Sequence, residues 1–240
     1  TIYEKNGDLK LVPASVNKVF TAYTALKKLK PNAVFKTSVY ASGPIRDGKL
    51  LGDLYLKGGG DPSLVSERLW MLVNELIRSG VTSVTGNLYA DSSFYDQEKN
   101  PPSRPTYLKD QAYNAPLGAL SFNFNTTTIF VRPGEKPGDS PIVFTDPENS
   151  YVDVVNHAKT GSEKSSNTIQ ASRTAFVKGD IGDTVLLKGN IPLGSKEVHF
   201  YRNIVNPALY TANIFKSFME QRKLTLTGNV LEGNVPPNAK

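Results

Sequence analysis

The residues whose chemistry stands out first are a serine and a lysine three positions apart, Ser15 and Lys18, in Pro13-Ala14-Ser15-Val16-Asn17-Lys18. If this segment begins a helix, a spacing of three places both side chains on one face, about one turn apart. A serine hydroxyl becomes a good nucleophile when a neighbouring base takes its proton, and a lysine serves as that base where burial or positive charge lowers its pKa. The pair therefore indicates acyl transfer, with Ser15 as nucleophile and Lys18 as base.

The residues that follow Pro13 are expected to position this pair. Apolar side chains recur at helical spacing as far as Pro31 and predict a long helix buried along one side: Val16, Val19, Phe20, Tyr23, Leu26 and Leu29. Ser15 would then lie in the first turn, where the helix dipole is positive and its backbone N–H would form half of an oxyanion hole. An S-x-x-K arises about once by chance in a chain rich in both residues, so a solvated lysine beside a helix-starting serine remains an alternative.

Composition narrows the classes of protein. With 240 residues and 39% hydrophobic content, the chain can form one large globular domain or two modest ones. The formal charge of +6 comes from 28 basic residues spread along the chain, which disfavours a nucleic-acid partner. Without cysteine and with only two histidines, His157 and His199, we expect no metal, no cofactor and no Ser-His-Asp triad.

Neither a transmembrane segment nor an export signal is expected in the sequence as it stands. No run reaches the roughly 18 apolar residues of a membrane helix, and no charged segment followed by an apolar one opens the chain. Residues 1–11 are typical of the second half of a hairpin. We therefore expect that any signal preceded Thr1.

The first half of the chain alternates strands and helices. Residues 35–41 and 50–56 predict two antiparallel strands joined across Asp47-Gly48, a hairpin turn pair. Residues 62–79 predict an amphipathic helix that ends at Gly80, followed by a strand at 84–90. The polar, proline-containing stretch 92–116 is expected to be a long loop.

The second half is expected to be mostly β, with one further helix. Short strands are predicted between turn residues, at 119–132, 151–156, 175–177, 184–189 and 198–202. A helix at 207–223 and a strand at 224–230 follow. The predicted order is helix, β-rich middle, helix and strand, with no internal repeat.

Five segments in this order resemble those of class C low-molecular-mass penicillin-binding proteins, the DacB-like D-alanyl-D-alanine carboxypeptidases and endopeptidases. The first is the active-serine segment 11–18 and the second is the glycine-rich turn 54–64, Leu-Tyr-Leu-Lys-Gly-Gly-Gly-Asp-Pro-Ser-Leu. The others are 86–94, 119–125, and 206–208 together with 226–230. The resemblance runs along the whole chain.

The resemblance implies an α/β transpeptidase-like (serine β-lactamase-like) domain, interrupted after the serine helix by a large β-rich insertion. Residues 1–34 and 203–240 would form a partial penicillin-binding domain, and residues 35–202 the insertion. Family members also use S-x-N and K-T-G motifs, which normally follow the last matching segment. We therefore expect the chain to be a fragment of a longer enzyme, although a genuine truncation remains an alternative.

The same resemblance implies a function, in the periplasm or cell envelope. Peptidoglycan stem peptides would be the substrates, and β-lactams would be covalent inhibitors that acylate Ser15. Tyr107 and Asp110 are the nearest candidates for the aromatic and acidic residues that grip the amino group of the stem, although the tryptophan expected there is absent and Trp70 lies on the second helix. The alternatives are a non-catalytic cell-wall or β-lactam-binding relative and a serine β-lactamase, which normally lacks so long an insertion.

Several segments are expected to imitate functional motifs. Lys159-Thr160-Gly161 and Ser165-Ser166-Asn167 spell K-T-G and S-x-N in reversed order. We expect both to be coincidental, in a polar loop far from Ser15, and we expect Ser121-Phe122-Asn123 to be part of a strand. The glycine-rich segment 57–62 lacks the G-K-[ST] ending of a phosphate loop and predicts a turn.

Three acidic residues are also expected to have no catalytic role, although their types would suit acid–base chemistry. Asp91, Asp96 and Glu98 could be read as supplying a carboxylate pair for acid–base catalysis. Acidic residues of polar loops are usually solvated, and we expect these three to be so.

Overall fold

The computed structural model describes residues 2–96, 98–101, 110–174 and 182–240. The chain forms two compact units, Thr1–Phe35 and Lys36–Lys240, and each is considered by itself. Among the described residues, no helix has both the length and the apolar character needed to cross a membrane.

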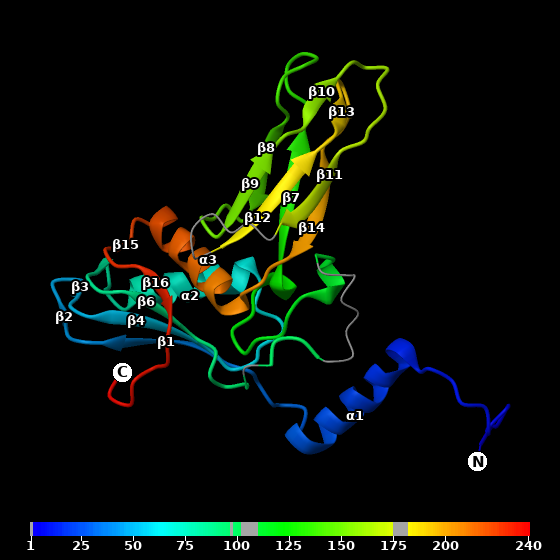
Figure 1. Cartoon of the computed structure of the whole chain (residues 1–240). Helices are drawn as coiled ribbons and strands as arrows, with labels where there is room; N and C mark the ends of the chain where they lie inside the picture. Colours follow the sequence, from blue (N-terminus) through cyan, green and yellow to red (C-terminus); the bar gives the residue numbers. More distant parts are fainter. Residues whose placement is uncertain (1, 97, 102–109, 175–181) are drawn as a thin grey trace. The chain divides into compact units, whose positions relative to one another are not determined.

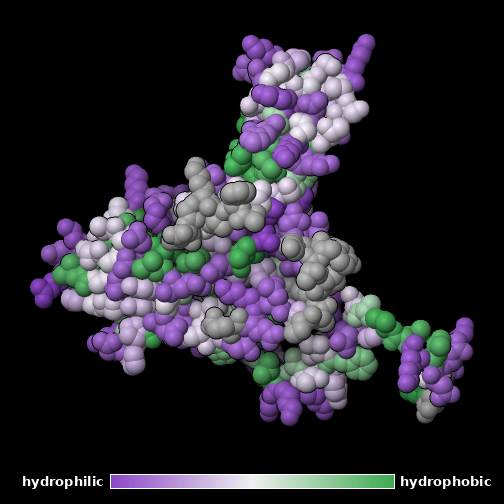
Figure 2. Space-filling view, in the orientation of Figure 1, coloured by the Kyte–Doolittle hydropathy of each residue, from purple (hydrophilic) through white to green (hydrophobic). Residues whose placement is uncertain are grey.

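The N-terminal unit contains a short 3-10 helix, η1 (Ala14–Val16), that continues into α1 (Asn17–Leu29). The predicted helix is confirmed, but Ser15 lies in the 3-10 turn before α1. Within this unit the apolar face is not buried, because Val19, Phe20 and Tyr23 are 66%, 66% and 61% exposed. Hydrophobic surface is visible along the unit (Figure 2). A single helix has no second layer within its own unit against which to bury a face. Residues 2–13 form turns and irregular backbone, without the expected strand.

The main unit has a four-stranded sheet in the order β1-β4-β6-β16 (Figure 1). Strand β1 (Thr37–Ser42) pairs antiparallel with β4 (Asp53–Gly58), as predicted. Strand β6 (Leu88–Asp91) lies parallel to β4, and β16 (Val230–Glu232) lies parallel to β6. Residues more than 140 positions apart thus meet in neighbouring strands.

A second small sheet has the order β15-β5-β3-β2. Strands β2 (Ile45–Arg46) and β3 (Lys49–Leu50) form a hairpin across Asp47 and Gly48, whose φ angles of 47° and 75° fit a type I′ turn. Strands β5 (Ser83–Val84) and β15 (Thr225–Leu226) complete this sheet.

Two predicted strands, 84–90 and 224–230, are each divided between the two sheets. The division falls at Gly86 and Gly228, where backbones approach closely. The Gly86 N–H donates to the Gly52 carbonyl and the Gly228 N–H to the Gly86 carbonyl, both at 3.0 Å. A β-carbon on Gly228 would lie 2.3 Å from the Gly86 carbonyl oxygen, so a side chain does not fit there.

Two helices cover this part of the unit. Helix α2 (Ser66–Arg78) buries Leu69 and Val73, and α3 (Pro207–Gln221) packs against β6, β16 and α2. The Asn206 side chain caps α3 by accepting a hydrogen bond from the Leu209 N–H. Both helices are confirmed within a few residues of their predicted ends.

The β-rich middle consists of two three-stranded sheets and a two-stranded ribbon. One sheet contains β14 (Val198–Asn203), β7 (Thr126–Arg132) and β8 (Ile142–Asp146). The other contains β11 (Gln170–Thr174), β12 (Asp183–Lys188) and β9 (Val152–Asn156). The ribbon pairs β10 (Lys159–Gly161) with β13 (Asn190–Pro192) in parallel.

The β-rich character of the middle is confirmed, but its details differ from the prediction. Strands β8, β10, β11 and β13 were not predicted, and the strand expected at 175–177 lies outside the described residues. The long loop contains a short helix, η3 (Ala112–Asn114).

The strand expected at 119–132 begins only at Thr126, so the prediction that Ser121-Phe122-Asn123 is part of a strand is wrong. Residues Asn123–Asn125 form the 3-10 turn η4, with positive φ at all three positions. Positive φ is incompatible with a strand. The Asn125 side chain stabilises the turn through bonds with the Phe122 N–H and the Pro116 carbonyl.

Residues 203–240 share a sheet and a hydrophobic core with residues 37–91, through β16 and α3. This C-terminal segment therefore packs with residues that we expected to belong to an insertion. The assignment of 1–34 and 203–240 to one domain stays a prediction.

The entry into α3 is held by two buried groups. Asp183, 5% exposed, accepts a hydrogen bond from the Val205 N–H at 2.8 Å, and the Tyr151 hydroxyl accepts one from the Asn206 N–H at 3.0 Å. Burial raises the pKa of Asp183, although the Val205 N–H and the Arg173 charge partly oppose this. Burial also raises the pKa of Tyr151, and the nearby Asp183 charge adds to that effect.

The raised pKa of Asp183 gives a testable pH dependence. A group with a raised folded-state pKa stabilises the fold fully below its unfolded pKa, near 3.9, and loses that contribution as pH rises through the folded value. Asp183→Asn keeps an oxygen for the Val205 N–H but does not titrate. We expect its melting temperature to rise relative to wild type as pH increases from about 4 to 7, measured by circular dichroism. A constant difference between the two proteins would contradict this.

Candidate active site

Ser15 and Lys18 are in direct contact, as their spacing predicts. The Lys18 Nζ donates a hydrogen bond to the Ser15 Oγ at 2.8 Å. Both side chains are exposed in the N-terminal unit. The neutral amine at the same distance would accept the hydroxyl proton, which is the geometry that general-base activation of a serine requires.

The backbone that presents Ser15 is a tight turn. The Val16 N–H donates to the Pro13 carbonyl at 3.0 Å, and the Asn17 N–H reaches the carbonyls of Ala14 and Ser15. Ala14, the residue before the serine, has a φ of 45°. Positive φ is strained for a residue with a side chain, and such strain is concentrated at functional sites.

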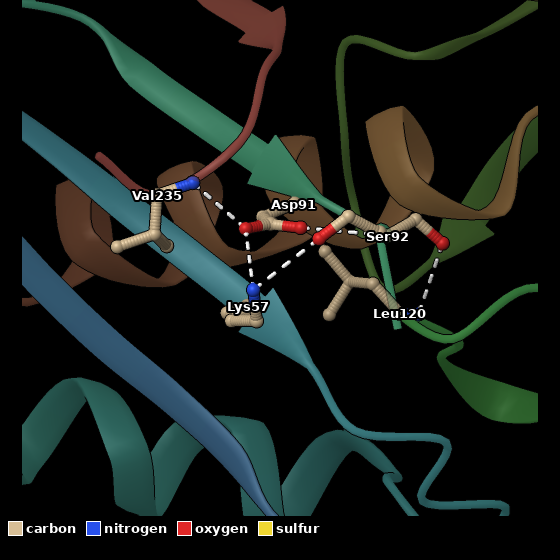
Figure 3. Close-up of polar contacts among 6 residues, drawn as sticks. Lys57, Asp91, Ser92, Leu120 and Val235 are labelled. Carbon is tan, nitrogen blue, oxygen red and sulfur yellow. Dashed lines mark hydrogen bonds and ion pairs between the residues drawn. The ribbon is translucent and has the colours of Figure 1, made fainter. Parts of the chain in front are cut away.

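A second contact between a serine and a lysine occurs in the main unit, where Figure 3 shows Lys57 beside Asp91. The Lys57 Nζ lies 3.2 Å from the Ser93 Oγ, but it also forms an ion pair with the Asp91 Oδ2 at 3.0 Å. The ion pair stabilises the charged ammonium, which has no lone pair with which to accept the Ser93 proton. This contact is therefore a poor candidate for nucleophile activation and a useful control for Ser15.

Asp91 itself is a structural residue, and the expectation that it is solvated is wrong. Its side chain is completely buried at the end of β6. The Oδ2 accepts from the Val235 N–H at 2.7 Å and the Oδ1 from the Ser93 N–H at 2.8 Å. Burial alone would raise the pKa of Asp91, but the hydrogen bonds from Ser93, Val235 and Lys57 outweigh it and hold the pKa below its usual value.

The whole of the chain, residues 1–240, matches the D-Ala-D-Ala carboxypeptidase 3 (S13) family. The chain belongs to this family. It is 33% identical to the D-alanyl-D-alanine carboxypeptidase of Actinomadura sp. (strain R39), over 98% of this chain and 44% of that protein. It is 28% identical to the D-alanyl-D-alanine carboxypeptidase DacB of Haemophilus influenzae, over 58% of this chain and 29% of that protein.

Solved structures show the same fold. The penicillin-binding protein 4 (dacB) of Haemophilus influenzae matches with a TM-score of 0.76 and 21% identity, over 96% of this chain and 50% of that one. A complex of the same protein with a β-lactam matches with a TM-score of 0.66 and 22% identity, over 96% and 47% of the two chains. The chain thus has the mixed α/β penicillin-binding-protein fold and spans about half the length of these relatives. The resemblance to DacB-like enzymes is confirmed.

Of the two residues predicted to bind substrate in this S13 family member, the structure describes Asp110 but not Tyr107. Tyr107 lies outside the described residues. The Asp110 carboxylate is half-buried, lies 3.4 Å from the Arg202 Nε and accepts a bond from the Arg173 N–H at 3.3 Å. In this arrangement Asp110 joins the loop to β11 and β14, and its role toward substrate stays a prediction.

The segment Lys159–Gly161, which spells K-T-G, forms strand β10. The expectation that it lies in a loop is therefore wrong. Its backbone is bonded on both sides, to β13 and to the turn at 138–139, where the Gly138 N–H donates to the Thr160 carbonyl at 2.8 Å. The buried Thr160 hydroxyl accepts from the Gly134 N–H. A substrate-binding K-T-G strand needs a free edge for its substrate, so this observation supports coincidence. The large separation expected between Ser15 and Lys159 or Asn167 stays a prediction.

The main unit also has clefts of about 420 Å³ and about 630 Å³, neither of which was predicted from the sequence. The cleft of about 630 Å³ lies between the glycine-rich turn and residues 112–125, and three partly exposed aromatic residues line it, namely Tyr95, Tyr113 and Phe124. The segment 119–125, which lines part of this cleft, resembled the family in sequence. That resemblance did not show that the segment borders a cleft. Among the described residues, no cluster of three or more His, Cys, Asp or Glu side chains is placed to hold a metal.

Proposed function

We propose that this S13 family member is a serine D-alanyl-D-alanine carboxypeptidase/endopeptidase that acts on peptidoglycan stem peptides. Ser15 is the nucleophile and Lys18 is its base. The observation that carries the proposal is the 2.8 Å contact between the Lys18 amine and the Ser15 hydroxyl in a strained turn at the start of a helix. Family membership supports peptidoglycan stem peptides as the class of substrate.

In the proposed reaction, the Ser15 Oγ attacks the carbonyl carbon of the D-Ala-D-Ala amide while the Lys18 amine takes the hydroxyl proton. The Ser15 N–H, at the positive end of α1, stabilises the oxyanion of the tetrahedral intermediate. The proton then passes to the nitrogen of the leaving D-alanine, and the stem remains as an ester on Ser15. Water hydrolyses that ester and regenerates the hydroxyl.

We propose that the complete active site includes polypeptide in addition to this chain. The enzyme is proposed to act in the periplasm or cell envelope. The chain spans 44% of one relative and 50% of a solved structure of the same fold. The apolar face of α1 is not covered within the N-terminal unit, and such a face is normally buried against a second layer. S-x-N and K-T-G motifs in the additional polypeptide would bind the substrate amide and carboxylate.

The direct test is to locate the acyl group formed by penicillin in the full-length protein that contains this sequence. The strained lactam mimics the D-Ala-D-Ala amide, and we expect mass spectrometry to find the adduct on the peptide containing Ser15. Ser93→Ala and Ser165→Ala, which alter the second serine–lysine contact and the imitation S-x-N, should be acylated normally. An adduct on another serine, or no adduct on active protein, would overturn the assignment.

A further inference from the structure

The edge of the four-stranded sheet at β1 carries an open row of backbone hydrogen-bonding groups. Strand β1 pairs with β4 on one side only, because it is the first strand in the order β1-β4-β6-β16. On its other side the Ala41 N–H donates to the Lys240 carbonyl at 2.8 Å, and the Lys240 N–H donates to the Ala41 carbonyl at 3.1 Å. The C-terminal segment therefore reaches this edge (Figure 1).

This reciprocal pair fixes the direction and the register of a strand that continues from Lys240. Two residues that exchange both bonds form a hydrogen-bonded pair of an antiparallel ladder. Polypeptide after Lys240 would therefore run antiparallel to β1, from Ala41 towards Thr37. Val39 and Thr37 present their N–H and C=O groups to the same side as Ala41, because these directions alternate along a strand. Among the described residues, none bonds to the backbone of Val39 or Thr37 on that side.

The sequence of β1 has none of the features that keep an edge strand unpaired. Thr-Ser-Val-Tyr-Ala-Ser contains no charged residue and no proline, which natural proteins place on exposed edges to prevent pairing with another strand. All six residues are half-buried. An uncharged edge with an open row of N–H and C=O groups is a template for one more strand.

A cleft beside this edge has room for side chains of such a strand. It has a volume of about 420 Å³ and lies between β1 and α2, with Lys240 among its lining residues. Val39 and Ala41 pack against the hydrophobic core, and residues opposite each other in a ladder share a face. The second residue after Lys240 would lie opposite Val39, with its side chain towards the cleft. Leu72 and Leu76 of α2 line that space and favour an apolar side chain.

We propose that the polypeptide following Lys240 in the full-length protein adds a fifth strand to this sheet along β1, with an apolar residue at its second position. The inference rests on the proposed function, in which further polypeptide completes the active site. The added strand runs past Thr37 to Lys36, the residue at which the main unit joins the unit that contains Ser15. The polypeptide that carries the S-x-N and K-T-G motifs therefore leaves the main unit beside the segment that leads to Ser15.

Disulfide trapping is a direct test, because these 240 residues contain no cysteine. The register places the third residue after Lys240 opposite Ser38, in a non-hydrogen-bonded pair with Cα atoms about 4.5 Å apart, which suits a disulfide. The protein tested is the full-length one with Ser38→Cys and a cysteine at that third position, and any other cysteine is replaced by serine. We expect mass spectrometry of its digest to show an intramolecular disulfide in most molecules.

The matched control moves the second cysteine to the second position after Lys240. Its side chain then lies on the opposite face of the sheet from Ser38, and no disulfide should form. Equal yields at the two positions, or no disulfide at the third, would overturn the proposal. A disulfide between two molecules would also contradict it, because β1 would then pair with a second copy.

Hydrogen exchange in the full-length protein provides a second measurement. We expect the Val39 and Thr37 amides to be protected, and a proline at the second position after Lys240 should speed their exchange by about tenfold, because it removes a ladder hydrogen bond. Fast exchange of both amides without the proline would show that the edge is open and that the proposal is wrong.

Both measurements are repeated in Ser15→Ala, since neither requires acylation. A disulfide in that protein would support the added strand even if the acylation test failed. An absent disulfide in a protein that penicillin acylates on Ser15 would overturn the added strand alone.

Discussion

Lys18→Ala in the full-length protein that contains this sequence is expected to slow acylation by penicillin roughly a hundredfold or more, the usual contribution of a positioned general base. The amine contacts the Ser15 hydroxyl at 2.8 Å, so its removal leaves water as the proton acceptor. Stopped-flow or gel-based kinetics with a fluorescent penicillin would measure the second-order rate. The loss should appear in the rate of acylation, and the modified residue should still be Ser15.

Lys28 provides the matched control for this experiment. It is an exposed lysine on the same helix α1, in its last turn. Lys28→Ala removes the same charge from the same helix, so a general electrostatic effect would slow both variants equally. A near-normal rate for Lys18→Ala would remove Lys18 from the proposed mechanism.

Asp91→Ala is expected to destabilise the main unit by about 2–4 kcal/mol, since it removes a buried carboxylate with charged and backbone partners. The substitution leaves the Val235 and Ser93 N–H groups without their acceptor and the Lys57 ammonium without its counterion. The residues around Val235 follow β16, so we expect the C-terminal segment to lose order first. Urea denaturation and hydrogen exchange of the Val235 amide would measure the two effects.

The pH dependence of the Asp91 contribution follows from its lowered pKa. A carboxyl whose folded pKa is lowered stabilises the fold above its unfolded pKa, near 3.9, and loses that contribution as pH falls through the folded value. The difference between wild type and Asp91→Ala should therefore shrink in acid below about pH 4. The control is the exposed Asp96→Ala, which should change stability by less than about 0.5 kcal/mol. Equal destabilisation by both variants would contradict the structural role of Asp91.

Much of the site and several local elements could be predicted from the sequence. The contact between Ser15 and Lys18 depends on residues three apart in a helical turn, and the hairpin at Asp47-Gly48 depends on two residues that tolerate positive φ. The start of α3 at Pro207, which was predicted, depends on the residues that directly follow Asn206. Each is a local feature, for which side-chain type and spacing are sufficient.

Other features were decided by residues distant in the chain. Asp91 belongs to a polar stretch that is typical of a solvated loop. Its side chain is bonded by Lys57 of β4, which precedes it in the chain, and by Val235, which follows it by 144 residues. Lys159–Gly161 became a strand because β13 and the turn at 138–139 supply its hydrogen bonds. The predicted strands at 84–90 and 224–230 were divided where Gly86 and Gly228 cross.

The neighbouring aromatic rings on the sheet β14-β7-β8 are a third example. Phe130, Phe144 and His199 occur at unrelated places in the sequence, and only the register of three strands aligns their rings. A shift of one residue in that register would turn each ring to the opposite side of the sheet. The sequence by itself therefore determined the contact between Ser15 and Lys18, because local helical geometry brings the two side chains together. The tertiary structure decided which distant side chains share a surface, because strand pairing is a long-range interaction.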